Sequence, residues 1–279
     1  MANAQRSRKI VDIISSQSAK SVKMLALELG VSEMTIRRDL QHLREKGVIN
    51  MLHGLAFRNE GTDHAYYDLQ EQQWIMHNEK AAIGRVAAAM IEPLDSVFID
   101  CGTTAASMAP NIPRGMDITV ICSTLNVLLE MHKKDIEKII FSGGYYHKST
   151  QTFESPEALQ MLGNIRASKM FVTSAGVSME LGLTCVHQYE IGLKRLGLNN
   201  AQKKILLVDS SKFGKVSSAF FGKLEQIDTV VTDSGIPDAW TRFLQDSGIE
   251  LIIANTQEGA LHNEQKRTLR QGGPYAAET

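Results

Sequence analysis

Seven short runs of β-branched and other apolar residues follow one another between residues 96 and 254, and helix-like segments such as residues 125–132 and 238–245 separate several of them. Strands that alternate with helices in this way are typical of a mostly parallel sheet with helices packed on its faces. The alternation therefore predicts an α/β domain. The runs are SVFID, ITVIC, KIIFS, MFVTS, ILLVD, TVVTD and ELIIA.

Small and polar residues follow five of these runs. The carboxyl ends of parallel strands meet at one edge of a sheet, and open α/β sheets bind their ligands there. The sequence therefore predicts a ligand site built from several loops. The loops are DCGTT at residues 100–104, STLN at 123–126, SGG at 142–144, SAG at 174–176 and DSSK at 209–212.

The backbone of these loops suits an anion. Gly102, Gly143 and Gly144 would let backbone N–H groups approach a ligand closely. A helix that starts at Thr103 or Thr104 would present its free N–H groups to a negative charge. The threonine hydroxyls could contribute further hydrogen bonds. The loops therefore predict a phosphate cradle.

The side chains of the same loops add a cation and several polar groups. Lys212 would complete the phosphate cradle, whereas Asp100 and Asn126 suit sugar hydroxyls, and Ser123 lies in the same set of loops. No G-x-G-x-x-G, Walker A, H-E-x-x-H or C-x-x-C pattern is present, so we predict neither a nucleotide cofactor nor a metal site. The residues alone indicate a small phosphorylated polyol as the ligand.

Charge is distributed unevenly along the chain. Residues 1–60 contain ten Lys or Arg and six Asp or Glu, a net charge of about +4, whereas the remaining residues carry about −5. A basic N-terminal region on an acidic protein is typical of a region that binds a polyanion. The charge therefore directs attention to nucleic acid as a partner of the N-terminal region.

Three amphipathic helices are predicted in this basic region. Ile10, Ile13 and Ile14 form the apolar face of the first, and Ser21 can cap the second, which Gly30 ends. The second and third helices are joined by a tight turn, which is the arrangement of a helix-turn-helix motif. The sequence therefore predicts a DNA-binding domain at the N-terminus.

The third predicted helix carries an apolar stripe of Ile36, Leu40 and Leu43, which we expect to face the core. The first turns of such a helix enter the major groove, where an arginine can donate two hydrogen bonds to guanine. We expect Asp39 to hold a neighbouring basic residue, because it would repel phosphates. The residues predicted to contact DNA from this helix are Ser32, Met34, Thr35, Arg37, Arg38 and Gln41.

Residues 48–52 and 55–57 read as two short strands joined at His53 and Gly54, which predicts a wing beside the third helix. We expect His53, near the tip of this wing, to donate a hydrogen bond to a DNA phosphate. Two-fold related heads would be needed to read a palindromic operator, so at least a dimer is expected.

Residues 32–40 and the wing resemble the N-terminal domain of the DeoR family of bacterial sugar-operon regulators. The family's wing usually carries an arginine where this chain has Asn50 and a glycine where it has Leu55. The resemblance covers residues 5–254 and implies that the C-terminal domain has a fold similar to ribose-5-phosphate isomerase and senses a phosphorylated sugar.

The family's ligand motifs are matched residue by residue, which implies effector-binding roles for these positions. Within the family, three segments resemble regulators of pentose operons most closely: residues 211–216, 100–102 and 182–185. This resemblance implies that the ligand is a pentose phosphate such as deoxyribose 5-phosphate. The matched positions are Asp100, Gly102, Thr103 and Thr104 of one loop, Glu190 and Lys194 of a Glu-x-x-x-Lys element, and Asp209, Ser211 and Lys212 of another loop.

We expect a winged helix-turn-helix domain at residues 1–58, a linker at 59–78, a sugar-phosphate-sensing domain at 79–254 and a disordered tail at 255–279. No apolar segment is long enough to span a bilayer, and no signal sequence is recognisable, so a cytoplasmic protein is expected. Cys101, Cys122 and Cys185 form no close pair and are predicted to be buried thiols of a reducing compartment.

Two other functions are compatible with these patterns. Glu190, Asp209 and Lys212 could form the acid and base groups of a sugar-phosphate isomerase, with the N-terminal region as an accessory module. Alternatively, a DNA-binding protein could sense an unphosphorylated sugar or a nucleotide. The interpretation that accounts for most of the patterns is a repressor without enzymatic activity, which dissociates from operator DNA when it binds a sugar phosphate.

Overall fold

The computed structural model describes residues 3–17, 19–45, 49–52, 55–58 and 69–256. The chain divides into two compact units, Met1–His77, called the head, and Asn78–Thr279, called the body. Each unit has a hydrophobic core of its own.

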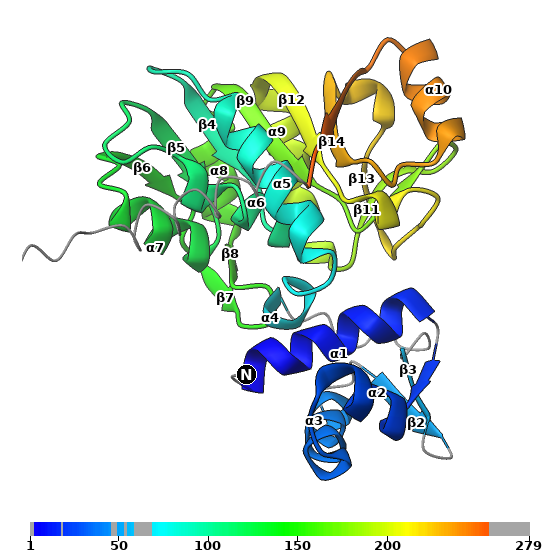
Figure 1. The fold of residues 1–279 in the computed structure, drawn as a ribbon. Helices are drawn as coiled ribbons and strands as arrows, with labels where there is room; N and C mark the ends of the chain where they lie inside the picture. The colour runs from blue at the N-terminus through cyan, green and yellow to red at the C-terminus, as the bar shows by residue number, and fades with distance from the viewer. Residues whose placement is uncertain (1–2, 18, 46–48, 53–54, 59–68, 257–279) are drawn as a thin grey trace, which may run out of the picture. The chain divides into compact units, whose positions relative to one another are not determined.

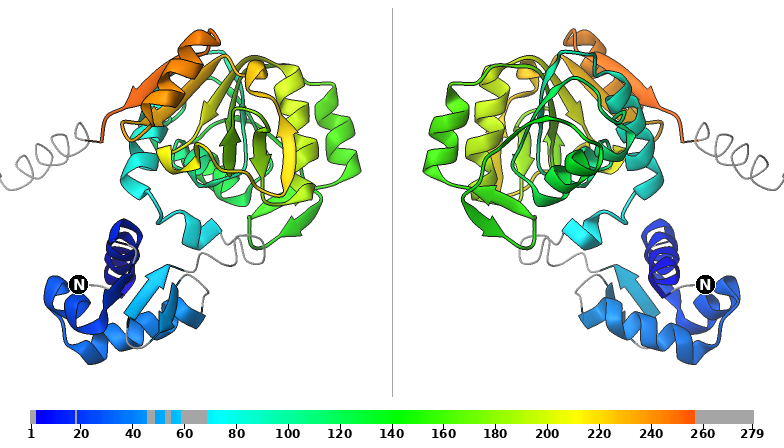
Figure 2. Two further views of the ribbon diagram at one scale, coloured as in Figure 1. Left: turned by 90° about the vertical axis from the view of Figure 1, so that its right-hand side faces the viewer. Right: turned by 90° about the vertical axis from the view of Figure 1, so that its left-hand side faces the viewer.

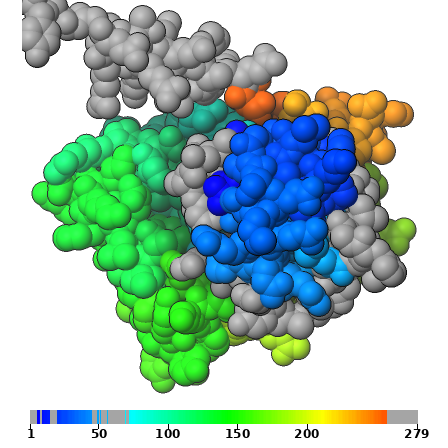
Figure 3. Space-filling view, turned by 60° about the horizontal axis from the view of Figure 1, so that its bottom comes forward, coloured from blue at the N-terminus to red at the C-terminus, as the bar shows by residue number. Residues whose placement is uncertain are grey.

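The head combines three helices with a small antiparallel sheet, and Figure 3 shows it in blue as a closely packed group of atoms. Ile10, Leu25, Ile36 and Leu40 form its core and have no exposed surface. The strand order is β1-β3-β2, and the hairpin β2–β3 is the predicted wing. The elements are α1 (Asn3–Gln17), β1 (Ala19–Ser21), α2 (Val22–Leu29), α3 (Glu33–Glu45), β2 (Ile49–Leu52) and β3 (Leu55–Arg58).

The predicted turn between α2 and α3 is confirmed in detail. The hydroxyl of Ser21 caps α2 by accepting a hydrogen bond from the Met24 N–H at 3.2 Å. Gly30 ends the helix with φ of 64°, a left-handed conformation that suits glycine. Ser32 accepts from the Thr35 N–H at 3.3 Å and so caps α3. Local capping chemistry therefore fixes where both helices start.

All seven predicted strands of the body are present and form one parallel sheet of order β15-β14-β12-β9-β4-β5-β6. Figure 1 shows this sheet extending across the body. Its strands are β4 (Ser96–Ile99), β5 (Thr119–Cys122), β6 (Lys138–Phe141), β9 (Ala167–Thr173), β12 (Ala201–Leu207), β14 (Thr229–Asp233) and β15 (Glu250–Ala254).

Helices cover both faces of this sheet, as the two views of Figure 2 show. Successive strand residues alternate between two cores: Val97 and Ile99 pack with one helix layer, whereas Phe98 packs with the other. The first layer contains α5 (His77–Ala89), α6 (Thr103–Ala106), η1 (Ala109–Asn111) and α7 (Leu125–Lys133), and the second contains α8 (Pro156–Gly163), α9 (Ile191–Asn200) and α10 (Asp238–Asp246).

Two small antiparallel sheets were not predicted. One is the hairpin of β7 (Tyr145–His147) and β8 (Thr152–Glu154), and the other has the order β10-β11-β13. The strands of the second are β10 (Gly176–Ser178), β11 (Gly182–Cys185) and β13 (Ala219–Gly222); the remaining short elements are α4 (Leu69–Gln72), η2 (Gln188–Glu190), η3 (Ser210–Lys212) and η4 (Leu224–Gln226).

The three cysteines are free and buried, as predicted. Burial raises the pKa of Cys122 and of Cys185 to about 12, so both thiols stay protonated at neutral pH. Within the described ranges, no helix is both long and apolar enough to cross a membrane. A disordered tail was predicted for residues 255–279, and of these all but the first two lie outside the described residues.

Candidate DNA-binding surface and effector site

The outer face of α3 presents the predicted DNA-contacting side chains to solvent. The Arg37 side chain is 59% exposed and lies 3.7 Å from the Glu33 carboxylate. Arg38 is exposed and forms no ion pair with any other described residue. Met34 and Gln41 are exposed, whereas Thr35 is partly buried beside the capping hydroxyl of Ser32, 2.9 Å away. Two cationic groups are therefore held on a well-packed helix with their charges directed outward.

Asp39 lies on the inner side of the same helix and is almost completely buried. It accepts two hydrogen bonds from Arg6 of α1, at 2.5 Å from Nε and 3.2 Å from Nη2. The prediction that Asp39 holds a basic residue is confirmed, but the sequence did not identify Arg6 as its partner. This pair fixes α3 to α1, because a bidentate arginine contact restrains both distance and orientation.

A further DNA contact was predicted from the wing. His53 lies outside the described residues, and the side chains of Asn50 and Leu55 are not described. The backbone of the wing is present as β2 and β3, and β1 adds a third strand that pairs with β3.

In the body, Asp100, Glu190 and Lys194 form a buried ionic cluster. The Lys194 Nζ atom lies 2.5 Å from Asp100 Oδ2 and 3.8 Å from Glu190 Oε2. Burial raises the pKa of Glu190. Although burial lowers the pKa of Lys194, the nearby acidic groups, with Asp100 as the largest contributor and Glu190 among the others, together more than offset it, and the net shift is well upward. Lys194 is therefore a buried cation that is paired with Asp100 and Glu190.

Thr173, at the end of β9, completes this cluster and was not predicted to belong to it. Its N–H and hydroxyl both donate to Asp100 Oδ2, at 2.9 Å and 3.1 Å, and its carbonyl accepts from Lys194 at 3.0 Å. Gly102 has φ of 120°, and a Cβ there would lie 2.6 Å from Thr173 Oγ1. Glycine is therefore required at position 102 because the loop passes close to β9.

Asp209, which follows β12, has a fully buried side chain. Its Oδ1 accepts hydrogen bonds from the N–H of Ser211 at 3.1 Å and from the hydroxyl of the same residue. Its Oδ2 has no hydrogen-bond partner among the described residues. Lys212, in η3, is partly exposed and forms no ion pair within the described part of the chain. This loop therefore holds a buried acceptor without a hydrogen-bond donor and a lysine without an ion pair, both among the described residues.

The remaining predicted effector residues lie on the same edge of the sheet in three loops. Thr103 and Thr104 begin α6 as expected, although this helix has only four residues. Ser123 is buried and precedes α7, where the side-chain Oδ1 of Asn126 accepts from the Val127 N–H at 2.9 Å. Gly143 and Gly144 follow β6 with φ of 67° and 106°. The loop at residues 100–104 is joined to the cluster around Lys194 through Asp100 and Cys101, whereas no hydrogen bond between described residues joins the loops at 123–126 and 142–144 to it.

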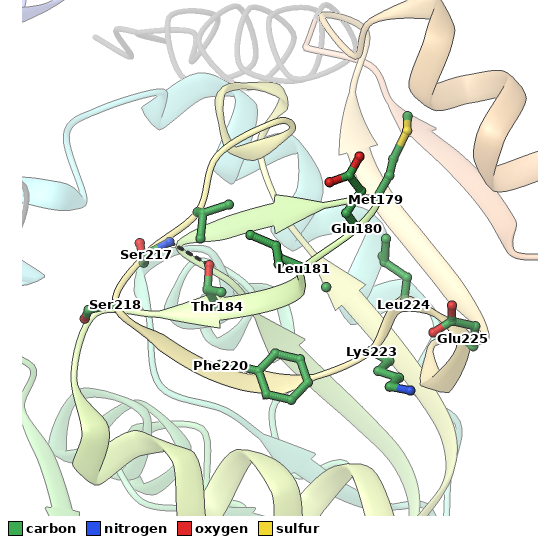
Figure 4. A pocket seen from close by; sticks show the side chains of 12 residues that line it. Met179, Glu180, Leu181, Thr184, Ser217, Ser218, Phe220, Lys223, Leu224 and Glu225 are labelled. Carbon is green, nitrogen blue, oxygen red and sulfur yellow. Dashed lines mark hydrogen bonds between the residues drawn. The ribbon is translucent and has the colours of Figure 1, made fainter.

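A separate hollow of about 450 Å³ lies over β11 and β13. Figure 4 shows Leu181, Thr184 and Phe220 among its lining, with a hydrogen bond of 2.8 Å from the Ser217 N–H to the Thr184 hydroxyl. None of the predicted effector residues lines it. The hollow is therefore distinct from the loops at the carboxyl ends of the strands.

The sequence is similar to those of several known repressors. The deoxyribose operon repressor of Escherichia coli (strain K12) is 34% identical over 231 residues, which are 83% of this chain and 90% of that protein. The lactose phosphotransferase system repressor of Staphylococcus epidermidis is 31% identical over 236 residues, 84% of this chain and 93% of that protein. Ribose 5-phosphate isomerase A from Methanocaldococcus jannaschii shows a distant structural likeness, with a TM-score of 0.37 and 14% identity, covering 50% of this chain and 55% of that one.

Two family profiles match the two halves of the chain. The DeoR-like helix-turn-helix domain matches residues 6–62, and the DeoR C terminal sensor domain matches residues 75–234. Together with the repressors above, which match most of the chain, they confirm the resemblance that the sequence motifs indicate. The chain belongs to the DeoR family of DNA-binding transcriptional regulators.

Proposed function

We propose that this protein is a cytoplasmic, homo-oligomeric repressor of a sugar or nucleoside catabolic operon, and that a phosphorylated sugar releases it from its operator. Deoxyribose 5-phosphate is the first effector to test, because the relative with 34% identity is a deoxyribose operon repressor. The ligand would prefer a conformation or dimer arrangement that fits the operator poorly, since only such a preference couples the two binding events.

In this proposal, α3 reads the operator. Arg37 and Arg38 donate to guanine or to phosphates, and Met34, Thr35 and Gln41 add contacts to base edges or backbone. Ser32 holds the first turn of the helix, and His53 contacts a phosphate from the wing. The outward exposure of both arginines, on a helix that Asp39 fixes from behind, supports this assignment.

The observation that carries the effector proposal is the buried Asp209 Oδ2 atom without a donor. A buried acceptor left unpaired costs free energy, so a ligand hydroxyl that donates to it would bind favourably. Lys212 is three residues away in the same loop, and its ammonium suits a phosphate. Asp209 therefore suits a hydroxyl of the sugar, and Lys212 suits the phosphate group of the same ligand.

The other predicted residues surround these two. Gly102, Thr103 and Thr104 would offer N–H and hydroxyl donors to the phosphate, and Gly143 with Gly144 would offer backbone donors from the next loop. The polar groups available for the sugar are Asp100, Ser123, Asn126, Glu190 and Lys194, three of which already hold one another in the buried cluster.

Lys212→Ala is expected to weaken the binding of deoxyribose 5-phosphate about tenfold to a hundredfold, because a charge-assisted hydrogen bond is worth ~1.5–3 kcal/mol. Isothermal titration calorimetry of the full chain measures this. Lys203→Ala is the control, since Lys203 is a partly exposed lysine near the opposite end of the preceding strand, where it pairs with Glu250.

Titration with unphosphorylated deoxyribose separates a phosphate sensor from a sugar sensor. Equal affinity for the two ligands, or unchanged affinity in Lys212→Ala, would refute the phosphate assignment. Conversion of the ligand during the titration would instead favour an isomerase-like enzyme.

Trp74→Ala is expected to bind operator and effector separately but to release operator poorly when effector is added. Trp74 stacks on His77 with 5.6 Å between ring centroids, just before the body begins. Coupling between two sites typically amounts to ~1–3 kcal/mol, so one lost aromatic contact can remove much of it. Operator affinity is measured with and without saturating effector, and an unchanged ratio would contradict this role. The other two aromatic residues of the predicted linker, Tyr66 and Tyr67, lie outside the described residues.

A further inference from the structure

The β7–β8 hairpin begins directly after the Gly143–Gly144 turn and is joined to the loop that follows β5. The Leu125 N–H donates to the Gln151 carbonyl at 2.9 Å, and the Phe153 N–H donates to the Ser123 carbonyl at 2.8 Å. Two of the predicted effector loops, residues 123–126 and 142–144, are therefore connected through this hairpin.

The tip of the hairpin is held in an unusual conformation. Gln151 has φ of 54°, which is uncommon for a residue other than glycine. On either side of it, Thr150 and Thr152 are buried. Strained backbone of this kind persists only where surrounding contacts hold it in place. The contacts at the tip are therefore expected to matter for where the hairpin lies.

Tyr189 of η2 supplies contacts of this kind from a third part of the body. Its ring is nearly parallel to that of His147 in β7, with centroids 3.7 Å apart and planes 8° apart. Its hydroxyl lies 3.0 Å from the Thr150 Oγ1. His187 stacks on the same ring at 4.9 Å. Tyr189 thus connects the hairpin to the turn that carries Glu190 of the buried cluster.

We propose that Tyr189 is a positioning residue for effector binding. It holds the β7–β8 hairpin against η2. One preorganised site then forms from the loops after β5 and β6 and the cluster of Asp100, Glu190 and Lys194. This inference rests on the proposed function, because it assigns Tyr189 to the same effector site. Tyr189 acts through the hairpin and need not touch the ligand.

A two-stranded hairpin is marginally stable by itself, so its position depends on what it packs against. The apparent affinity of a ligand falls in proportion to the fraction of protein in the binding-competent state. If loss of the Tyr189 ring leaves the hairpin in place about a tenth of the time, effector affinity falls about tenfold. Tyr189→Phe keeps the stack on both imidazoles and loses only the hydroxyl contact, so it should retain most of the affinity.

The test compares Tyr189→Ala, Tyr189→Phe and the unmodified full-length protein in two measurements. Hydrogen exchange without ligand reports whether the amides of residues 145–154 lose protection. Calorimetry with deoxyribose 5-phosphate reports affinity. We expect faster hairpin exchange and about tenfold weaker binding in Tyr189→Ala, substantial recovery of both in Tyr189→Phe, and unchanged operator affinity without effector in both variants.

Unchanged hydrogen exchange of the hairpin amides in Tyr189→Ala would show that Tyr189 does not hold the hairpin to η2, whether or not any sugar phosphate binds. Faster exchange with unchanged effector affinity would overturn the positioning role while leaving the proposed function intact. Failure of the unmodified protein to bind any sugar phosphate would overturn the proposed function and, with it, the role of Tyr189 in effector binding. The hydrogen-exchange result would still decide whether Tyr189 holds the hairpin to η2. Weaker binding in Tyr189→Ala with full protection of the hairpin would also overturn the proposal, because the effect would then not pass through the hairpin.

Discussion

Replacement of Arg37 and Arg38 together by alanine is expected to weaken operator binding about a hundredfold or more and to leave the head folded. A bidentate arginine contact to a base is worth ~1–3 kcal/mol, and two lost contacts multiply their effects on affinity when they are independent. Both side chains point away from the core formed by Ile36 and Leu40, so their removal opens no cavity.

Fluorescence anisotropy with labelled operator, repeated at several salt concentrations, measures this effect. If either arginine binds phosphate, the slope of log affinity against log salt should become less steep in the double variant. The matched control is Arg114→Ala with Arg242→Ala, which removes two exposed arginines from the body. Retention of full affinity by a folded double variant of α3 would show that the recognition surface lies elsewhere.

Lys194→Met is expected to destabilise the body by ~3–5 kcal/mol, because removing one partner of a buried ion pair leaves the other charge uncompensated. Methionine keeps an unbranched stem of similar shape and lacks the terminal ammonium, so the lost cation accounts for most of the effect. Asp100 and Glu190 would then both lie buried without the ammonium that neutralises them. Urea unfolding of the full chain should show an earlier transition of the body and an unchanged transition of the head.

The same variant should depend on pH in a particular direction. Burial raises the pKa of Glu190 even beside Lys194, and loss of the cation would raise the pKa of this carboxyl further. A group whose pKa is higher in the folded than in the unfolded state binds more protons when folded, so stability falls as pH rises. The deficit of Lys194→Met should therefore be smaller at pH 5 than at pH 8. A variant as stable as the unmodified protein at both pH values would rule out an energetic role for the pair.

The main sheet could be predicted because its strands are buried between two helix layers. A strand covered on both faces appears in the sequence as an apolar run, as in the segments that became β4, β5 and β14. The helix-turn-helix could be predicted for a different reason, since its caps and glycine turn depend on neighbouring residues. Ser21, Gly30 and Ser32 each act within four residues of their own position.

The features that were missed depend on contacts between distant residues. Thr173 acquires its role from Asp100, 73 residues earlier, and Tyr189 from Thr150, 39 residues earlier. The strands β7 and β10 have only three residues each, too few for a periodic pattern to be recognised. The sequence could therefore indicate which loops follow the strands of the sheet, but not which side chains hold those loops together.

The pair between Arg6 and Asp39 anchors α3 through a residue of α1 that is not itself predicted to contact DNA. Arg6 is in the first helical turns of α1, whereas the side chain it holds is in the middle of α3. A protein shortened by its first six residues would keep every residue predicted to contact DNA and yet leave the Asp39 carboxylate buried without its cation. Such a variant would therefore have an unchanged body sequence and a poorly anchored α3.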